Sequence, residues 1–254
     1  MTPGGLLLDV DGTLLDGERA FPGAAEAVAR ARARGTAVRF TTNTTRRPRS
    51  ATAAALSEAG IDARREEILI PASLARSSIV ASGRRRAFAL VPPHALEDFD
   101  GVEMVEDRPD WVVVGDLGPG FTYELLNRAF LHLRGGAGLI ALHRNRFWHA
   151  SPSRGLVLDA GPFVAALEYA AGVTAEVVGK PSRRFFDLAL ADVGLPPDQV
   201  LVVGDDVVND VLGGASAGCR TALVRTGRYE PGAAEAAEAK PDLVLDSIAD
   251  LLRT

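Results

Sequence analysis

Short apolar runs alternate along the chain with longer stretches in which apolar and polar residues recur at helical spacing. Short buried strands separated by amphipathic helices are typical of βαβ units, which assemble into a mostly parallel sheet. The predicted strands are 6–10, 38–41, 68–70, 87–91, 111–114, 139–142, 177–178, 200–203, 221–224 and 243–245. The predicted helices are 22–34, 50–59, 72–82, 123–133, 162–171, 184–193, 210–217 and 248–252, with a surface helix within 232–240 and a polar loop from 143 to about 154. The pattern therefore predicts an α/β fold.

Composition narrows the class of protein. The chain has 254 residues, 47% of them hydrophobic, which suits one large domain or two small ones. Lys and Arg total 28 against 33 Asp and Glu, and the net charge of −5 lacks the basic excess typical of nucleic-acid binders. The single cysteine, Cys219, excludes an internal disulfide and favours a reducing compartment, so we expect a cytoplasmic location. Acidic residues interrupt the first twenty positions and no run approaches ~18 apolar residues, so neither a signal peptide nor a membrane span is expected.

The first predicted strand runs directly into two carboxylates, Asp9 and Asp11. Residues i and i+2 of an extended chain share a face, so both carboxylates can enter one pocket at the carboxyl end of a parallel strand. Gly12 allows the chain to turn sharply behind them. The structural alternative is an ordinary turn and helix cap, because Asp and Gly are common turn residues.

Three later segments place complementary groups after predicted strands. Thr42 and Asn43 follow the second strand and can donate hydrogen bonds to phosphate oxygens, although a helix cap or turn explains them equally well. Lys180 follows strand 177–178, where an ammonium could neutralise phosphoryl charge, although most lysines simply face solvent. Asp205, Asp206 and Asp210 end and follow strand 200–203. Together with Asp9 they would form a site for a hard cation, for which Mg²⁺ is the natural occupant.

These four segments, in this order, resemble the four motifs of the haloacid dehalogenase-like hydrolase superfamily, and the resemblance extends over essentially the whole chain to its NagD-like group. The resemblance implies a Rossmann-like doubly wound parallel-sheet core with an inserted α/β cap of the C2 type. Thr42 and Lys180 lie 138 residues apart, far more than the roughly 30 residues of a βαβ crossover, which independently indicates an insertion. We therefore predict a discontinuous catalytic core, 1–83 and 177–254, and a cap domain, 84–176.

The resemblance also assigns roles to individual residues. Asp9 is the expected nucleophile, and Asp11 the expected general acid and base. The expected Mg²⁺ ligands are carboxylate oxygens of Asp9 and Asp205 and the backbone carbonyl of Asp11. The remaining residues form two sets: Thr42, Asn43 and Lys180 would hold the phosphoryl oxygens, while Gly12, Asp206 and Asp210 would support the site from behind, with Asp206 or Asp210 as an alternative direct ligand.

The resemblance implies a Mg²⁺-dependent phosphatase that forms an aspartyl-phosphate on Asp9. Its substrates would be small phosphate monoesters, and the branch it resembles suggests pyrophosphate or phosphoamino acids. The main alternative is a phosphoacceptor signalling domain with a long-lived aspartyl-phosphate; a degenerate binding module is a third reading. Asp11, a built-in base, argues against a stored phosphoryl signal. Related proteins often pair through the cap, so a homodimer is a further expectation, with neither nucleic acid nor membrane as partner.

The cap is the least readable region. The polar segment 143–149 could present cations and aromatic rings to a substrate, or form a solvated loop with packed aromatics. Segment 116–120 superficially resembles a dinucleotide-binding glycine loop, but it lacks GxGxxG spacing and Pro119 removes an amide.

Overall fold

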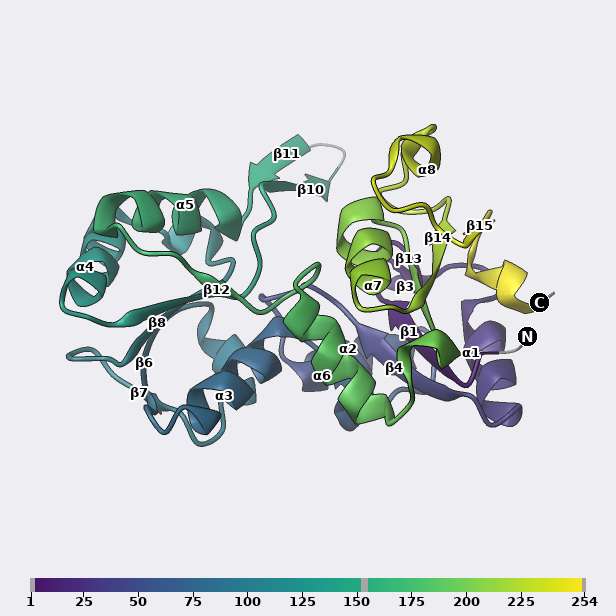
Figure 1. The fold of residues 1–254 in the computed structure, drawn as a ribbon, viewed down its shortest axis with the longest axis horizontal. Helices are drawn as coiled ribbons and strands as arrows, with labels where there is room; N and C mark the ends of the chain where they lie inside the picture. Colours follow the sequence, from purple (N-terminus) through teal and green to yellow (C-terminus); the bar gives the residue numbers. More distant parts are fainter. Residues whose placement is uncertain (1–2, 152–154, 253–254) are drawn as a thin grey trace. The chain divides into compact units, whose positions relative to one another are not determined.

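The computed structural model describes residues 3–151 and 155–252. It divides the chain into two compact units: the first comprises 1–42, 49–69 and 180–254, and the second comprises 43–48 and 70–179. Each unit contains its own parallel sheet, six-stranded in the first and five-stranded in the second (Figure 1). The sequence-based division places the insertion at 84–176, whereas the second unit comprises 43–48 and 70–179 and therefore includes the helix α3 (Pro71–Ala81).

The sheet of the first unit has the strand order β15-β14-β13-β1-β4-β5, and every neighbouring pair is parallel. The strands are β1 (Gly5–Asp9), β4 (Ala37–Thr41), β5 (Ile68–Leu69), β13 (Val200–Gly204), β14 (Arg220–Val224) and β15 (Leu243–Leu245). The chain adds β4 and β5 on one side of β1 and later adds the other three strands on the opposite side. This reversal at β1 is the switch point at which doubly wound sheets bind ligands, beyond the carboxyl ends of the strands.

Helices and short turns connect these strands. The helices are α1 (Ala24–Ala33), α2 (Arg49–Glu58), α6 (Arg183–Val193), α7 (Gly213–Ser216) and α8 (Ala233–Ala236). The 3₁₀ turns are η1 (Arg65–Glu67), η4 (Pro197–Gln199) and η6 (Ile248–Leu252), and a small hairpin pairs β2 (Leu15–Asp16) with β3 (Arg19–Ala20). Two predictions need correction: 248–252 is a 3₁₀ turn, and helix 210–217 is a π-helical turn, η5 (Val207–Leu212), followed by the short α7.

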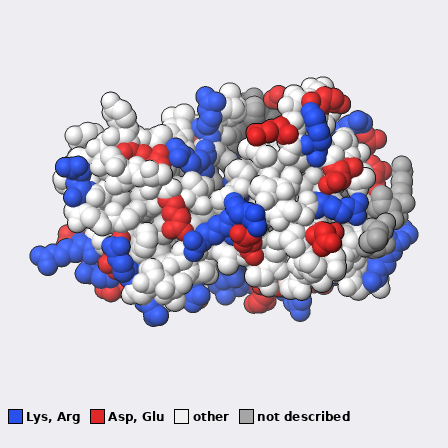
Figure 2. Space-filling model, viewed as in Figure 1, with Lys and Arg blue, Asp and Glu red and all other residues white. Residues whose placement is uncertain are grey.

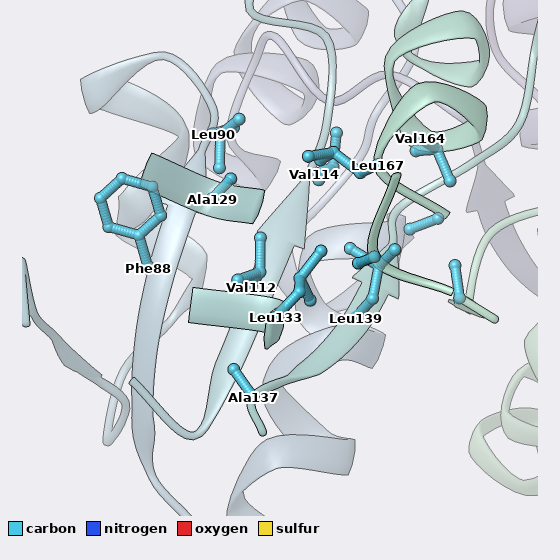
Figure 3. Close-up of a cluster of buried hydrophobic side chains, with 13 residues drawn as sticks. Phe88, Leu90, Val112, Val114, Ala129, Leu133, Ala137, Leu139, Val164 and Leu167 are labelled. Atoms are coloured by element: carbon cyan, nitrogen blue, oxygen red, sulfur yellow. The ribbon is translucent and has the colours of Figure 1, made fainter. Parts of the chain in front are cut away.

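The sheet of the second unit has the order β12-β9-β8-β6-β7 and is also parallel throughout. Its strands are β6 (Arg86–Leu90), β7 (Glu103–Met104), β8 (Trp111–Val114), β9 (Gly138–Ala141) and β12 (Glu176–Val177). Besides α3, the helical segments are α4 (Tyr123–Arg134), α5 (Ala160–Ala171) and the 3₁₀ turns η2 (Pro93–Asp98) and η3 (Gly118–Gly120). Figure 3 shows strand residues such as Val112 and Val114 packed with Leu133 of α4 and Leu167 of α5. The second unit therefore buries a hydrophobic core of its own.

The predicted polar loop to residue 154 is wrong in part, because β10 (Phe147–Ser151) pairs antiparallel with β11 (Gly155–Leu158). Phe147 lies opposite Leu158 across this pair, and both side chains are about half exposed. A strand is predicted from sequence when apolar and polar residues alternate, because one of its faces is buried. This hairpin leaves apolar side chains in solvent, so that pattern is missing.

Charged side chains of both signs are interspersed over the face shown in Figure 2. Among the described residues, no helix combines the length and the apolar character needed to cross a bilayer.

Candidate active site

The strand β1 delivers Asp9 to the switch point of the first sheet. Leu6, Leu7 and Leu8 are buried on both faces of the sheet, so the apolar run is held as a central strand. Asp9, its last residue, is itself only 6% exposed. The chain then turns at Gly12, whose φ of +98° suits glycine, and the amide of Gly12 donates to the carbonyl of Leu15 over 2.8 Å.

Lys180 lies between two of the carboxylates. Its Nζ donates to Oδ1 of Asp9 over 2.6 Å and to Oδ1 of Asp210 over 2.7 Å, and all three side chains are buried. Burial lowers the pKa of Lys180, but Asp210 and Asp9 outweigh that effect and raise it above the ordinary lysine value. Lys180 is therefore a fixed positive charge inside an acidic site.

Glycine at the end of β13 is needed for this arrangement, because a Cβ on Gly204 would overlap the carboxyl group of Asp210. Burial raises the pKa of Asp210, against the effect of the Lys180 ammonium. Burial likewise raises the pKa of Asp9 well above its ordinary value, and the contact with Lys180 opposes the rise. The protein thus holds these carboxylates where water solvates them poorly.

Asp205 completes a cluster of three buried carboxylates. Carboxylate oxygens of Asp9, Asp205 and Asp210 all lie within 4.8 Å of one another. Burial, with the nearby Asp210 carboxylate, raises the pKa of Asp205 to about 7. One oxygen in the cluster, Oδ2 of Asp9, is buried and has no hydrogen-bond partner among residues 3–151 and 155–252.

These observations fit a hard divalent cation. Mg²⁺ and Ca²⁺ take oxygen ligands, and several carboxylates are commonly gathered for that purpose. A cation would satisfy the buried Oδ2 of Asp9 and remove the repulsion that, with burial, raises the carboxylate pKa values. The donor set therefore suits a divalent metal.

The carboxylate of Asp206 accepts hydrogen bonds from a neighbouring turn, whereas that of Asp205 belongs to the cluster of three. Its Oδ1 accepts hydrogen bonds from the backbone amides of Val208 and Asn209, and its Oδ2 accepts from the side-chain amide of Asn209. The side chain therefore caps η5, the turn that carries Asp210.

Thr42 and Asn43 are consecutive residues that belong to different units. Thr42 belongs to the first unit, and its hydroxyl donates to Oδ2 of Asp11 over 3.0 Å. Asp11 is exposed, in contrast to the buried Asp9. Asn43 belongs to the second unit, where its Oδ1 lies beside Gly179. The first unit thus contains every predicted site residue except Asn43.

The loop after β14 contributes contacts to which the sequence analysis gave no role. The backbone amide of Arg228 donates to Oδ2 of Asp205 over 2.6 Å, and the Thr226 hydroxyl donates to the carbonyl of Gly12 over 2.6 Å. In the sequence, this Thr-Gly-Arg segment stands directly after a predicted strand and lies within 224–229, one of the segments that carry the family resemblance.

Side chains of the polar segment 143–149 contact other residues of the second unit. Nε2 of the buried His143 lies 3.5 Å from Oδ1 of Asp159. The guanidinium of Arg144 forms a bidentate ion pair with Glu168, in which Nη1 lies 3.2 Å from Oε1 and Nη2 lies 2.8 Å from Oε2. Trp148 packs under Arg46, whose guanidinium carbon lies 5.2 Å from the ring centre. These contacts favour a packed structural role for these side chains.

Comparison with known proteins agrees with the geometry. The family model for haloacid dehalogenase-like hydrolases matches residues 6–104, and that for HAD-hydrolase-like proteins matches 177–251. Phospholysine phosphohistidine inorganic pyrophosphate phosphatase from Rattus norvegicus is 38% identical over 97% of this chain and 92% of its own length.

Two solved structures share the fold. The 4-nitrophenylphosphatase from Thermotoga maritima superimposes with a TM-score of 0.92 at 29% identity, covering 99% of this chain and 97% of its own. NagD from E. coli K-12 superimposes with a TM-score of 0.89 at 24% identity, covering 98% of both chains. The predicted fold class and the resemblance to the NagD-like group are thereby confirmed. The chain belongs to the haloacid dehalogenase-like hydrolases and is an enzyme of that family.

Proposed function

We propose that this enzyme is a divalent-metal-dependent phosphatase that transfers a phosphoryl group from a small substrate to Asp9 and then to water. The first unit would be the catalytic core and the second the cap. The carrying observation is the state of Asp9: Lys180 orients Oδ1, whereas Oδ2 is buried without a hydrogen-bond partner among the described residues. An oriented and poorly solvated carboxylate is an effective nucleophile.

In the first step a carboxylate oxygen of Asp9 attacks phosphorus, and the bond from phosphorus to the leaving oxygen breaks. Asp11 donates a proton to that oxygen, so the leaving group departs as a neutral alcohol. The exposure of Asp11 and its hydrogen bond from Thr42 support this role, since the acid must reach the substrate while keeping a defined orientation.

In the second step Asp11 takes a proton from water, and the resulting hydroxide attacks phosphorus. The bond between phosphorus and the Asp9 oxygen breaks, which releases inorganic phosphate and restores both carboxyl groups. Lys180, Thr42 and Asn43 would hold phosphoryl oxygens, and the contact of Lys180 with Asp9 also opposes the rise that burial causes in the pKa of Asp9.

We propose Mg²⁺ as the metal. Asp9 and Asp205 would bind it through carboxylate oxygens and Asp11 through its backbone carbonyl, while Asp210 holds Lys180 and Asp206 caps η5. When bound, the ion supplies positive charge that draws the anionic substrate toward carboxylates that would otherwise repel it.

Names of relatives indicate the substrate class. One relative is named for phospholysine, phosphohistidine and inorganic pyrophosphate, and another for 4-nitrophenyl phosphate. We therefore propose small phosphate monoesters, together with pyrophosphate or phosphoamino acids, as substrates. We also propose a homodimer through the second unit, supported by the exposed apolar residues Phe147, Leu156 and Leu158 of its hairpin.

The test is phosphate release from 4-nitrophenyl phosphate, pyrophosphate and phosphohistidine by the wild-type chain, Asp9→Asn and Asp198→Asn. Asp198 is an exposed carboxylate of η4 and serves as the matched control. We expect Mg²⁺-dependent turnover that Asp9→Asn lowers at least ~10³-fold and Asp198→Asn leaves unchanged. Activity retained by Asp9→Asn, or a phosphoenzyme that forms but persists for hours, would refute the proposal, the latter in favour of a signalling switch.

A further inference from the structure

The loop that follows β14 reaches the carboxylate cluster from the opposite end of the first unit's sequence. Thr226, Gly227 and Arg228, here called the clasp loop, lie against the Gly12 turn and against Asp205. None of the three residues is acidic, so none could be recognised as a site residue by a carboxylate, as Asp9, Asp205 and Asp210 were. Gly227 and Arg228 nevertheless approach one carboxylate, Asp205, and Thr226 contacts the Gly12 turn beside it.

The first contact comes from the backbone. The amide of Arg228 donates to Oδ2 of Asp205 over 2.6 Å, a short charge-assisted hydrogen bond. A carboxylate whose one oxygen is held by a fixed amide has a defined rotation about its side-chain bonds. The amide therefore determines how Asp205 faces its neighbours in the cluster.

The second contact is a close approach of two glycines. A Cβ on Gly12 or on Gly227 would overlap Oδ2 of Asp205, and it would also come within 3.1 or 2.6 Å of the Cα atom of the other glycine. Both have left-handed backbone conformations, with φ of +98° and +58°. The Thr226 hydroxyl donates to the carbonyl of Gly12 over 2.6 Å and joins the two turns. Asp205 is thus enclosed by backbone that tolerates no side chain.

We propose that the clasp loop is a positioning element of the metal site, in which Gly227 and the Arg228 amide hold Asp205 in the orientation that binds a divalent cation. This inference rests on the metal site proposed above. A carboxylate that is oriented before the cation arrives loses less conformational freedom on binding. Displacement of Asp205 should therefore weaken cation binding without unfolding the sheet.

The Arg228 side chain contributes less than its amide. Its Nη1 lies 3.4 Å from Oδ2 of Asp206, but the side chain is 46% exposed, and exposed ion pairs contribute little. The proposal therefore separates two substitutions in one loop. Gly227→Ala should impair cation binding strongly, whereas Arg228→Met, which keeps the backbone amide, should change it little.

The experiment measures binding of Mg²⁺ alone by calorimetry to the full chain, with no substrate present. Gly232→Ala is the matched control, because Gly232 also has a positive φ, +84°, but a Cβ there would meet nothing within 4 Å. Gly227→Ala and Gly232→Ala both place alanine at a positive φ, at a similar cost in backbone strain, but only Gly227→Ala disturbs Asp205. We expect the dissociation constant to rise at least ~10-fold in Gly227→Ala and to stay within ~3-fold of wild type in Gly232→Ala and Arg228→Met.

Circular dichroism and thermal unfolding without metal establish that each variant is folded. If Gly227→Ala does not fold, Thr226→Val removes the hydroxyl that joins the two turns and adds no atoms beside Asp205; it should weaken Mg²⁺ binding ~3-fold or more, while Thr226→Ser should not. If Gly227→Ala is folded and binds Mg²⁺ as tightly as Gly232→Ala does, the proposal for the clasp loop is overturned. If Gly227→Ala is unfolded, the same conclusion follows when Thr226→Val binds Mg²⁺ as tightly as the wild type. Neither result affects the proposed metal site. Absence of Mg²⁺ binding by the wild-type chain overturns the metal site itself.

Discussion

At the scale of single residues, the site depends on a buried lysine held by two buried carboxylates. Lys180 donates to Asp9 and Asp210, and the three side chains are almost fully enclosed. Removing Lys180 would leave these buried carboxylates without their counter-charge, and breaking a buried ion pair in this way costs ~3–5 kcal/mol. Substitutions of these residues therefore change stability together with activity. Asp11 is the more informative residue, because it is exposed and its loss disturbs little packing.

Asp11→Asn tests the general acid. Asparagine has the same shape and can still accept the hydrogen bond from Thr42, so the fold should persist. We expect turnover of an alkyl phosphate to fall ~10²–10⁴-fold, because an alkoxide is a poor leaving group without a proton. Formation of the phosphoenzyme from 4-nitrophenyl phosphate should fall much less, because 4-nitrophenolate departs unprotonated.

Single-turnover kinetics with the two substrates measure these rates. An equal loss of phosphoenzyme formation for both would show that Asp11 does not protonate the leaving group. An unchanged rate of phosphoenzyme hydrolysis would show that it does not activate water either.

At the scale of elements, the carboxyl ends of parallel strands bring the site together. The ends of β1, β4 and β13 are neighbours in one sheet, so Asp9, Thr42 and Asp205 converge although they are far apart in sequence. The segment after β4 leaves this unit at once and is anchored in the other. There the Thr45 hydroxyl accepts a hydrogen bond of 2.8 Å from the Asp116 amide, and the Asp116 carboxylate lies 3.2 Å from Arg46.

Thr45→Val tests this anchor. Valine has nearly the same shape, but it leaves the buried amide of Asp116 without its acceptor. We expect the free energy of unfolding to fall by ~1–3 kcal/mol and KM to rise, since Asn43 lies in the anchored segment. Urea unfolding and steady-state kinetics measure the two effects. Thr45→Ser keeps the hydroxyl and is the control; an equal loss of stability in Thr45→Ser would show that the hydroxyl is not what stabilises this anchor.

At the scale of the whole molecule, the acidic cluster makes stability depend on pH and metal. The chain has a net charge of −5, and three of its carboxylates lie buried within 4.8 Å of one another. The pKa values of Asp9, Asp205 and Asp210 are all raised, with burial as the largest cause. In the metal-free enzyme the folded state therefore holds protons that the unfolded state has already released.

The sign of the pH dependence follows from this difference. Between pH 4 and pH 7 the folded state binds more protons than the unfolded state, so the free energy of unfolding falls as pH rises. The shift of the Asp205 pKa from 3.8 to about 7 corresponds to at most about 4 kcal/mol over that range. We expect urea unfolding of metal-free wild type to show this decline and Asp205→Asn to show a smaller one.

Saturating Mg²⁺ should reverse the trend, because the cation binds the ionised carboxylates and competes with protons. The Mg²⁺-dependent increase in melting temperature should accordingly be larger at pH 7.5 than at pH 5. A metal-free stability that rises between pH 5 and pH 7 in wild type but not in Asp205→Asn would contradict the raised pKa.

Much of the fold was predictable because burial marks it in the residue pattern. The apolar runs at 6–10, 111–114 and 200–203 predicted strands, and the structure has β1, β8 and β13 there. The exceptions have local causes. The side chain of Asp206 caps two backbone amides and begins a π-helical turn, and β10 pairs in a hairpin whose Phe147 remains exposed. The turn buries Val211, but one buried apolar residue cannot distinguish a π-helical turn from an α-helix, and the hairpin leaves Phe147, Leu156 and Leu158 exposed.

The sequence by itself determined the class of fold and the family, and it predicted the acidic residues of the candidate site, because parallel strands end at one edge and their polar residues follow in order. Only the tertiary structure decided which groups touch. It places Lys180 between Asp9 and Asp210, assigns Asp206 to capping, and directs the Arg228 amide at Asp205. A backbone amide is common to every residue except proline, so its role in a site arises from where the chain folds rather than from which side chain it carries.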